Sequence, residues 1–141
     1  MIDAMDPSIP LVPHQPPSRL IDSVREAGGE SCTTLTRVDP KAWYADLDGA
    51  MPAWFGLELM AQTIAAFNGN RHRGDLAPKY GYLLGTREYR CTVAAFPAGA
   101  QLEVEAKVHE AEILGLSAFA CELRLDGSVL AHAILKVYEP A

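Results

Sequence analysis

One segment constrains the fold of this chain more than any other: residues 52–68, PAWFGLELMAQTIAAFN, predict a single long helix. Pro52 suits the first turn of a helix, where a missing N–H costs nothing, and Gly69 follows as a C-terminal stop. Most residues between them are good helix formers. Because apolar side chains occur all round the segment, we expect other structure to wrap it.

The remaining segments alternate apolar and polar residues, which indicates half-buried strands. Before the helix, two such segments flank a Gly28-Gly29 turn and predict a hairpin. Four more strands are expected after residue 80, with turns at residues 96–99 and 126–127. The expected strands lie within residues 18–27, 30–38, 79–93, 101–110, 116–127 and 128–140. This order predicts an α+β fold, with an antiparallel curved sheet wrapped round one long central helix.

Composition excludes several classes of protein. A chain of 141 residues, 49% of them apolar, is expected to form one domain over residues 1–141. Its net charge of −6 argues against a nucleic-acid partner, and no apolar run is long enough for a membrane span. Residues 1–10 lack the pattern of a signal peptide, and the widely spaced Cys32, Cys91 and Cys121 suggest reduced thiols. We therefore expect a cytoplasmic protein.

Two motifs resemble the β-hydroxyacyl-thioester dehydratases of the hotdog fold. Residues 12–24, VPHQPPSRLIDSV, are similar to the N-terminal segment of the fatty-acid-synthesis enzymes, where a Pro-His pair precedes a proline, an apolar pair and Asp. Residues 51–62, MPAWFGLELMAQ, are similar to their helix start, with Pro52 six residues before Glu58 and then Ala61-Gln62. The helix, LLGTREY and the ending LKVYEP look most similar to small dehydratase-like proteins of aryl polyene biosynthesis.

This resemblance implies a site for dehydration of 3-hydroxyacyl groups carried on acyl carrier protein, with no cofactor and no metal. In the family the helix acid, here Glu58, faces a tunnel at a dimer interface and works with a histidine. An apolar enclosure would raise the pKa of Glu58, which suits a general acid.

The same resemblance gives substrate-binding roles to residues around the helix start. N–H groups from Ala53 to Gly56, Phe55 included, would polarise the thioester carbonyl, and Gly56 would let substrate approach closely. Gln62, one turn after Glu58, lies on the same helix face and would orient the carboxyl group.

The chain departs from the family at the histidine. Tyr44 stands where the family has that residue, eight residues before Pro52. His14 is the one histidine inside a family-like motif, and it either replaces the missing base or is a turn residue. A second hotdog chain is the other possible source of a base. Glu58 itself has a simpler alternative role as a paired structural carboxylate. The remaining histidines, His72, His109 and His132, are expected to be structural or solvated.

Residues 71–90 carry five basic residues against two acids, a charge of +3 within a chain of −6. We expect Arg71, Arg73 and Arg87 to dock an acidic carrier protein or the phosphate of its pantetheine arm, and the alternative is a solvated loop.

Three functions remain open from the sequence. They are an acyl-carrier-protein dehydratase or dehydratase subunit, a non-catalytic hotdog chain that completes a partner's tunnel, and an acyl-thioester hydrolase. In each case we expect a homodimer or a heterodimer, because half of such a fold exposes a sheet edge and a helix flank.

Overall fold

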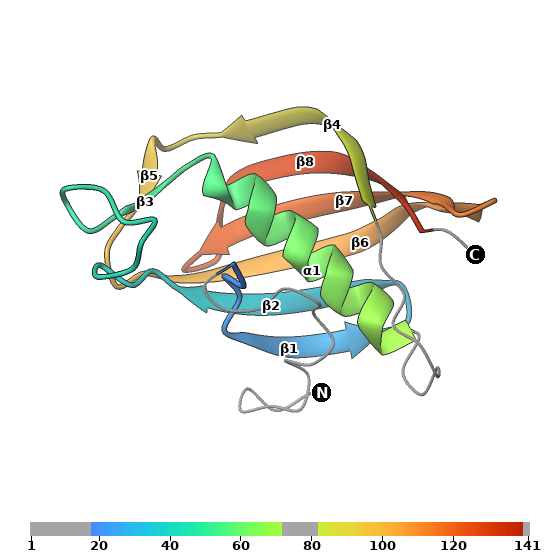
Figure 1. The fold of residues 1–141 in the computed structure, drawn as a ribbon, viewed down its shortest axis with the longest axis horizontal. Coiled ribbons are helices and arrows are strands. Elements are labelled where there is room, and N and C mark those ends of the chain that lie inside the picture. The colour runs from blue at the N-terminus through green and yellow to red at the C-terminus, as the bar shows by residue number, and fades with distance from the viewer. Residues whose placement is uncertain (1–17, 72–81, 140–141) are drawn as a thin grey trace.

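The computed structural model of the protein describes residues 18–71 and 82–139 (Figure 1). His14, His72 and Arg73 lie outside these ranges, and the side chains of residues 82–84 and of Arg87 are not described. The elements are β1 (Ser23–Gly28), β2 (Ser31–Arg37), β3 (Met51–Pro52), α1 (Phe55–Arg71), β4 (Tyr82–Cys91), β5 (Ala95–Phe96), β6 (Gln101–Ile113), β7 (Leu116–Leu125) and β8 (Ser128–Tyr138).

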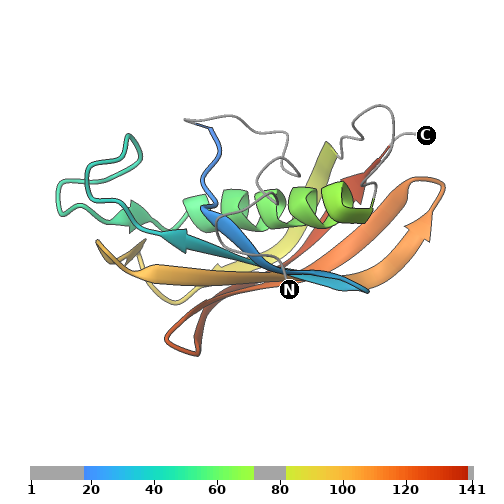
Figure 2. The ribbon, with the colours of Figure 1, turned by 90° about the horizontal axis from the view of Figure 1, so that it is seen from below.

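Six strands form one antiparallel sheet in the order β1-β2-β6-β7-β8-β4, and α1 packs against one face of it (Figures 1 and 2). The alternation of residues sets which face of each strand is buried. On β6, for example, Leu102, Val104 and Ala106 are fully buried, whereas Gln101 and Lys107 are exposed. The sheet-and-helix architecture predicted from the sequence is therefore confirmed.

The predicted hairpin turns are confirmed as well. Residues 29–30 connect β1 to β2, and Asp126-Gly127 connects β7 to β8. Asp126 (φ 51°) and Gly127 (φ 83°) both have positive φ, as a two-residue type I′ turn requires. Asp and Gly are among the residues that adopt this conformation most readily.

The predicted bounds of the helix were wrong at both ends. Pro52 does not begin the helix but lies in β3, which pairs with the equally short β5, and neither two-residue strand was predicted. Gly69 does not end the helix, because α1 continues to Arg71. Arg71 lies over the Phe67 ring, with Cζ 5.7 Å from the centroid, and forms an ion pair of 3.3 Å with Glu139. A paired cation at the helix C-terminus favours this last turn despite the glycine.

One face of the helix packs against the sheet (Figure 2). Leu59, Met60 and Ile64 are among its buried residues. On the side away from the sheet, four residues at helical spacing are half-buried, and we refer to them as the helix stripe: Leu57, Glu58, Ala61 and Ala65. Within the described residues, no helix is long and apolar enough to cross a membrane.

Candidate functional site

Glu58, the polar member of the helix stripe, is in contact with Gln62, which neighbours the stripe on α1. Glu58 lies in the first turn of α1 and is half-buried, whereas Gln62, one turn later, is fully buried. Gln62 Nε2 donates a hydrogen bond of 3.1 Å to Glu58 Oε1. Residues four apart on a helix lie one above the other, so the sequence spacing alone places these two groups in contact.

The rest of the Gln62 amide is bonded to the segment that precedes β1. Nε2 also donates to Ser18 O at 2.8 Å, and Oε1 accepts from Leu20 N at 2.8 Å and from Ile21 N at 3.4 Å. An amide with two donors and two acceptor sites is fully used by these four contacts. Gln62 was expected to orient the carboxyl group of Glu58, and its hydrogen bonds to Glu58 and to residues 18–21 agree with that role. Its contact with substrate stays a prediction.

At the helix start, fewer backbone N–H groups lack a hydrogen-bond acceptor than the sequence predicted. The N–H of Ala53 donates to Ala94 O at 3.0 Å, and that of Gly56 donates to Ala53 O at 3.0 Å. These two groups are therefore not the free donors that the sequence suggested. The N–H groups of Trp54 and Phe55 have no acceptor among the described residues, and they stand at the positive end of the helix dipole.

The side chain of Tyr89, which the sequence analysis did not single out, occupies the space beside Gly56. The hydroxyl of Tyr89, on β4, donates to Ala53 O at 2.5 Å, and together with the Phe96 ring it fills the space that a side chain at Gly56 would take. The close neighbour of Gly56 in this structure is thus Tyr89, and the expected approach of substrate at Gly56 stays a prediction. Burial raises the pKa of Tyr89, so its hydroxyl stays protonated.

An irregularity in β4 accompanies this contact. The register with β8 shifts between Arg87 and Arg90, and Glu88 has a φ of 56°. A bulge of this kind re-aims side chains along a strand. Neither the bulge nor Tyr89 had a pattern in the sequence that pointed to the helix start.

Tyr44, at the position of the family histidine, is not a base. Its hydroxyl accepts a hydrogen bond of 2.8 Å from Asp39 N, and burial raises its pKa. At neutral pH the group is therefore a neutral phenol. Its ring lies 5.9 Å from Trp43 and 5.8 Å from Phe55.

Aromatic side chains surround the helix start. Phe55, which was expected to bind substrate, is half-buried with its ring 5.5 Å from Trp43 and 6.0 Å from Trp54. Trp43 is 60% exposed and Trp54 is 70% exposed. These rings give the helix start an apolar, accessible border on one side.

Of the three arginines expected to dock a carrier protein, the structure describes the side chain of Arg71 alone. Arg71 is paired with Glu139, so its charge is partly used within the chain. Arg73 lies outside the described residues, and only the backbone of Arg87 is described. Their docking role stays a prediction. Among the described residues, no group of three His, Cys, Asp or Glu side chains is placed to hold a metal ion.

The fold and the helix acid define the class of the protein as a hotdog-fold protein, and comparisons with solved structures agree. One chain of "The Dehydratase Heterocomplex ApeI:P from Xenorhabdus doucetiae" is similar at a TM-score of 0.88 and 28% identity, over 96% of this chain and 91% of that one. TT0310 from Thermus thermophilus matches at 0.63 and 17% identity, over 82% and 89%. A hypothetical thioesterase with coenzyme A from Streptococcus pneumoniae matches at 0.62 and 8%, over 83% and 86%. The last two matches show the shared fold alone.

Residues 7–141 match the profile of the family described as ApeP-like, ApeP dehydratase. The chain belongs to this ApeP-like dehydratase family. Among curated proteins, no match was found. The function expected from the sequence, dehydration of an acyl thioester, is supported by the family and by the dehydratase structure. The thioesterase alternative fits less well, because its support is likeness of fold.

Proposed function

We propose that this chain dehydrates 3-hydroxyacyl groups carried as thioesters on acyl carrier protein, as one subunit of a two-chain hotdog enzyme. The acyl group is of the fatty-acid or polyene type. The observation that carries the proposal is the carboxyl group of Glu58, which a fully buried amide holds in a half-buried helix stripe.

In the proposed reaction, Glu58 acts as the general acid. A base removes the α-proton of the thioester, and the electron pair forms the double bond as the C–O bond of the β-hydroxyl breaks. Glu58 gives its proton to the departing oxygen, which leaves as water. The N–H groups of Trp54 and Phe55, which have no acceptor among the described residues, would stabilise negative charge that develops on the thioester oxygen.

The base comes from a partner chain in this proposal. Tyr44 is a neutral phenol already bonded to Asp39 N, so the family position in this chain supplies no base. The helix stripe is half-buried and partly apolar, which is the kind of surface that a second subunit covers. A similar structure is described as a dehydratase heterocomplex, which supports the same arrangement.

A chain that works only in a pair should not be monomeric under working conditions. We expect light scattering to give a mass well above the 15.3 kDa of one chain, either alone or with the partner. A homogeneous species of one chain's mass in the presence of the partner would contradict the proposal.

The test of function uses the chain together with the second hotdog protein from the same host. The pair is incubated with 3-hydroxyacyl carrier protein, and the intact carrier protein is followed by mass spectrometry. Loss of one water from the carrier-bound acyl group is the expected result. Release of the free acid would identify a thioesterase instead. Loss of water at an equal rate with Glu58→Gln would identify a subunit that only completes its partner's tunnel.

A further inference from the structure

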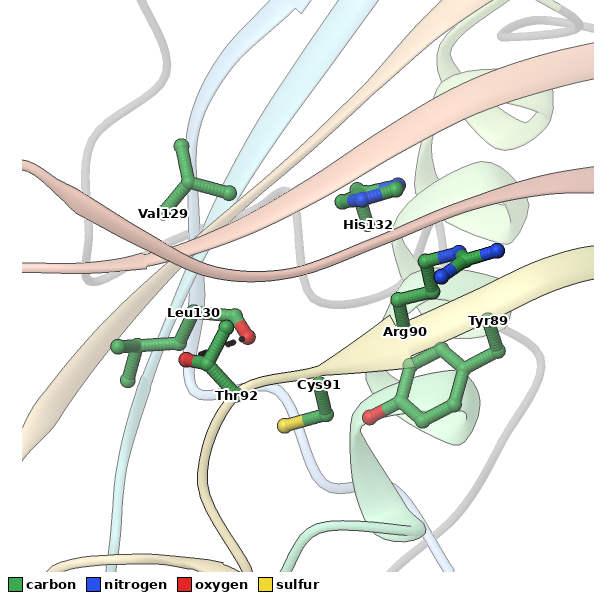
Figure 3. Close-up of a pocket in the computed structure, with 7 residues that line it drawn as sticks. All are labelled: Tyr89, Arg90, Cys91, Thr92, Val129, Leu130 and His132. Atoms are coloured by element: carbon green, nitrogen blue, oxygen red, sulfur yellow. Dashed lines mark hydrogen bonds between the residues drawn. The ribbon is translucent and has the colours of Figure 1, made fainter.

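A cleft lies where the end of β4 meets the start of β8, apart from the helix stripe (Figure 3). Its cavity volume is about 510 Å³. The lining includes residues from both faces of the strand edge: Tyr89 and Cys91 pack toward the core, whereas Arg90 and His132 are exposed. The cleft therefore wraps round the edge of the sheet.

Two basic side chains stand together in this cleft. Arg90 and His132 are register partners on neighbouring antiparallel strands, so their side chains lie on the same face of the sheet, as Figure 3 shows. Thr92 also lines the cleft, next to Leu130, and its hydroxyl donates to Leu130 O at 3.3 Å (Figure 3). The groups left to meet a ligand are thus the guanidinium and the imidazole.

Arg90 has no carboxylate partner among the described residues, in contrast to other arginines of the chain. Arg25 pairs with Glu103, and Arg71 pairs with Glu139. The carboxylate nearest to His132 in register, Glu122, is bonded to Arg124 at 3.2 Å. In a chain of net charge −6, an arginine that has no carboxylate partner in the described part of the chain and lies beside a histidine in a cleft suits an anion in both charge and geometry.

The cleft is connected to the helix start through one side chain. Tyr89 lines the cleft, and its hydroxyl is bonded to Ala53 O in the turn that precedes α1. A thioester with its carbonyl at the N–H groups of Trp54 and Phe55 would therefore have this cleft nearby for the arm that carries it.

We propose that Arg90 and His132 bind the phosphate of the pantetheine arm that carries the acyl thioester. This inference rests on the proposed function and adds the group that holds the far end of the arm. Arg90 offers two N–H donors to a phosphate, and His132 offers one. The same phosphate chemistry occurs in carrier-bound pantetheine and in coenzyme A.

The test compares three 3-hydroxyacyl thioesters with the two-chain enzyme: on carrier protein, on coenzyme A and on N-acetylcysteamine, which has no phosphate. The variants are Arg90→Gln and His132→Gln. Lys136→Gln is the matched control, because it removes a charge from an exposed residue of β8 that is outside the cleft lining. We expect kcat/KM for both phosphate-bearing substrates to fall by about tenfold or more in Arg90→Gln, as for the loss of a charge-assisted hydrogen bond. The value for N-acetylcysteamine thioester should stay at the wild-type level.

Other outcomes overturn the site. An equal loss on all three substrates would mean that Arg90 supports the fold or the acyl site. A loss on carrier protein with none on coenzyme A would place the contact on the surface of the carrier protein. A loss of the same size in Lys136→Gln would show a general charge effect.

A binding measurement separates the site from the proposed reaction. Coenzyme A is titrated into the chain with its partner, and the backbone amides of residues 90–92 and 130–132 are followed by NMR. We expect shifts in the wild type that are lost in Arg90→Gln. If the wild type dehydrates none of the three substrates, the proposed function fails, while the titration still decides whether Arg90 and His132 bind the phosphate. Absence of shifts in an active enzyme would overturn the site alone.

Discussion

Gln62 Nε2 lies 3.1 Å from Glu58 Oε1 and 2.8 Å from Ser18 O, so one buried amide nitrogen joins the helix carboxyl group to the segment before β1. The orientation of the Glu58 carboxyl group thus depends on the position of residues 18–21 against the helix. That dependence distinguishes a positioned acid from a carboxylate that happens to lie on a helix.

Gln62→Glu should separate the positioning role from a purely structural one. The new carboxylate keeps acceptors for Leu20 N and Ile21 N but loses the donors to Glu58 and Ser18. Two adjacent carboxyl groups share a proton, so the apparent pKa of the pair rises above that of a carboxyl in the unfolded chain. Stability relative to wild type should therefore fall as pH rises from about 4 to 7.

Two readings check this prediction: chemical denaturation across that pH range, and the pH–rate profile, whose acid-dependent limb should move to higher pH. Gln62→Met is the control, since it is similar in size and carries no charge. It should lose stability by about 1–3 kcal/mol per buried group left unpaired, at every pH. A wild-type pH–rate profile in Gln62→Glu would contradict the positioning role.

Glu58→Gln should keep the fold and lower the dehydration rate by about 10²-fold or more, because the amide has a similar shape but no proton to give. The rate is measured with the partner present, and circular dichroism checks the fold. Activity within a few-fold of wild type would remove Glu58 from the chemistry. Failure to fold would favour the role of a structural carboxylate.

Tyr44→Phe should leave the dehydration rate within a few-fold of wild type. The phenol is not a base here, and the change removes only the acceptor of Asp39 N, at a cost of about 0.5–1.5 kcal/mol in unfolding free energy. The assay and a denaturation curve measure the two effects. A drop of about 10²-fold in rate, as for loss of a general acid or base, would make Tyr44 catalytic.

Gly56→Ala should destabilise the protein by about 1–3 kcal/mol, because the new methyl group meets the Tyr89 hydroxyl. Tyr89→Phe removes that oxygen together with its bond to Ala53 O. In the Tyr89→Phe background Gly56→Ala should therefore cost clearly less, and the double-mutant cycle should give a coupling free energy. Additive effects of the two changes would mean that Tyr89 does not account for the glycine.

Much of the fold followed from local patterns. The alternation in β6 and the Asp126-Gly127 turn specify a strand and a hairpin without help from the rest of the chain. The helix bounds did not follow, because Pro52 fits a helix start and a short strand equally well, and only pairing with β5 decides between them. Gly69 was mistaken for a stop because the pairing of Arg71 with Glu139 joins residues 68 apart.

Some features of the candidate site could also be predicted from local sequence patterns, and others could not. Contact of Glu58 with Gln62 was predictable, since helical spacing alone brings them together. Tyr89 was not, because a bulge in a distant strand and the space at Gly56 together bring its hydroxyl to Ala53. The burial of Gln62 was also missed, as it depends on the segment from Ser18 to Ile21 folding back onto the helix.

In the proposed enzyme this chain gives the acid and a second chain gives the base. The most direct measurement is dehydration of 3-hydroxyacyl carrier protein by the purified chain alone, by the chain with the second hotdog protein, and by both preparations with His14→Ala. We expect activity only after the second protein is added, and no effect of His14→Ala on that activity. Strong activity of the chain alone that disappears in His14→Ala would show that this chain supplies its own base and would contradict the two-chain mechanism.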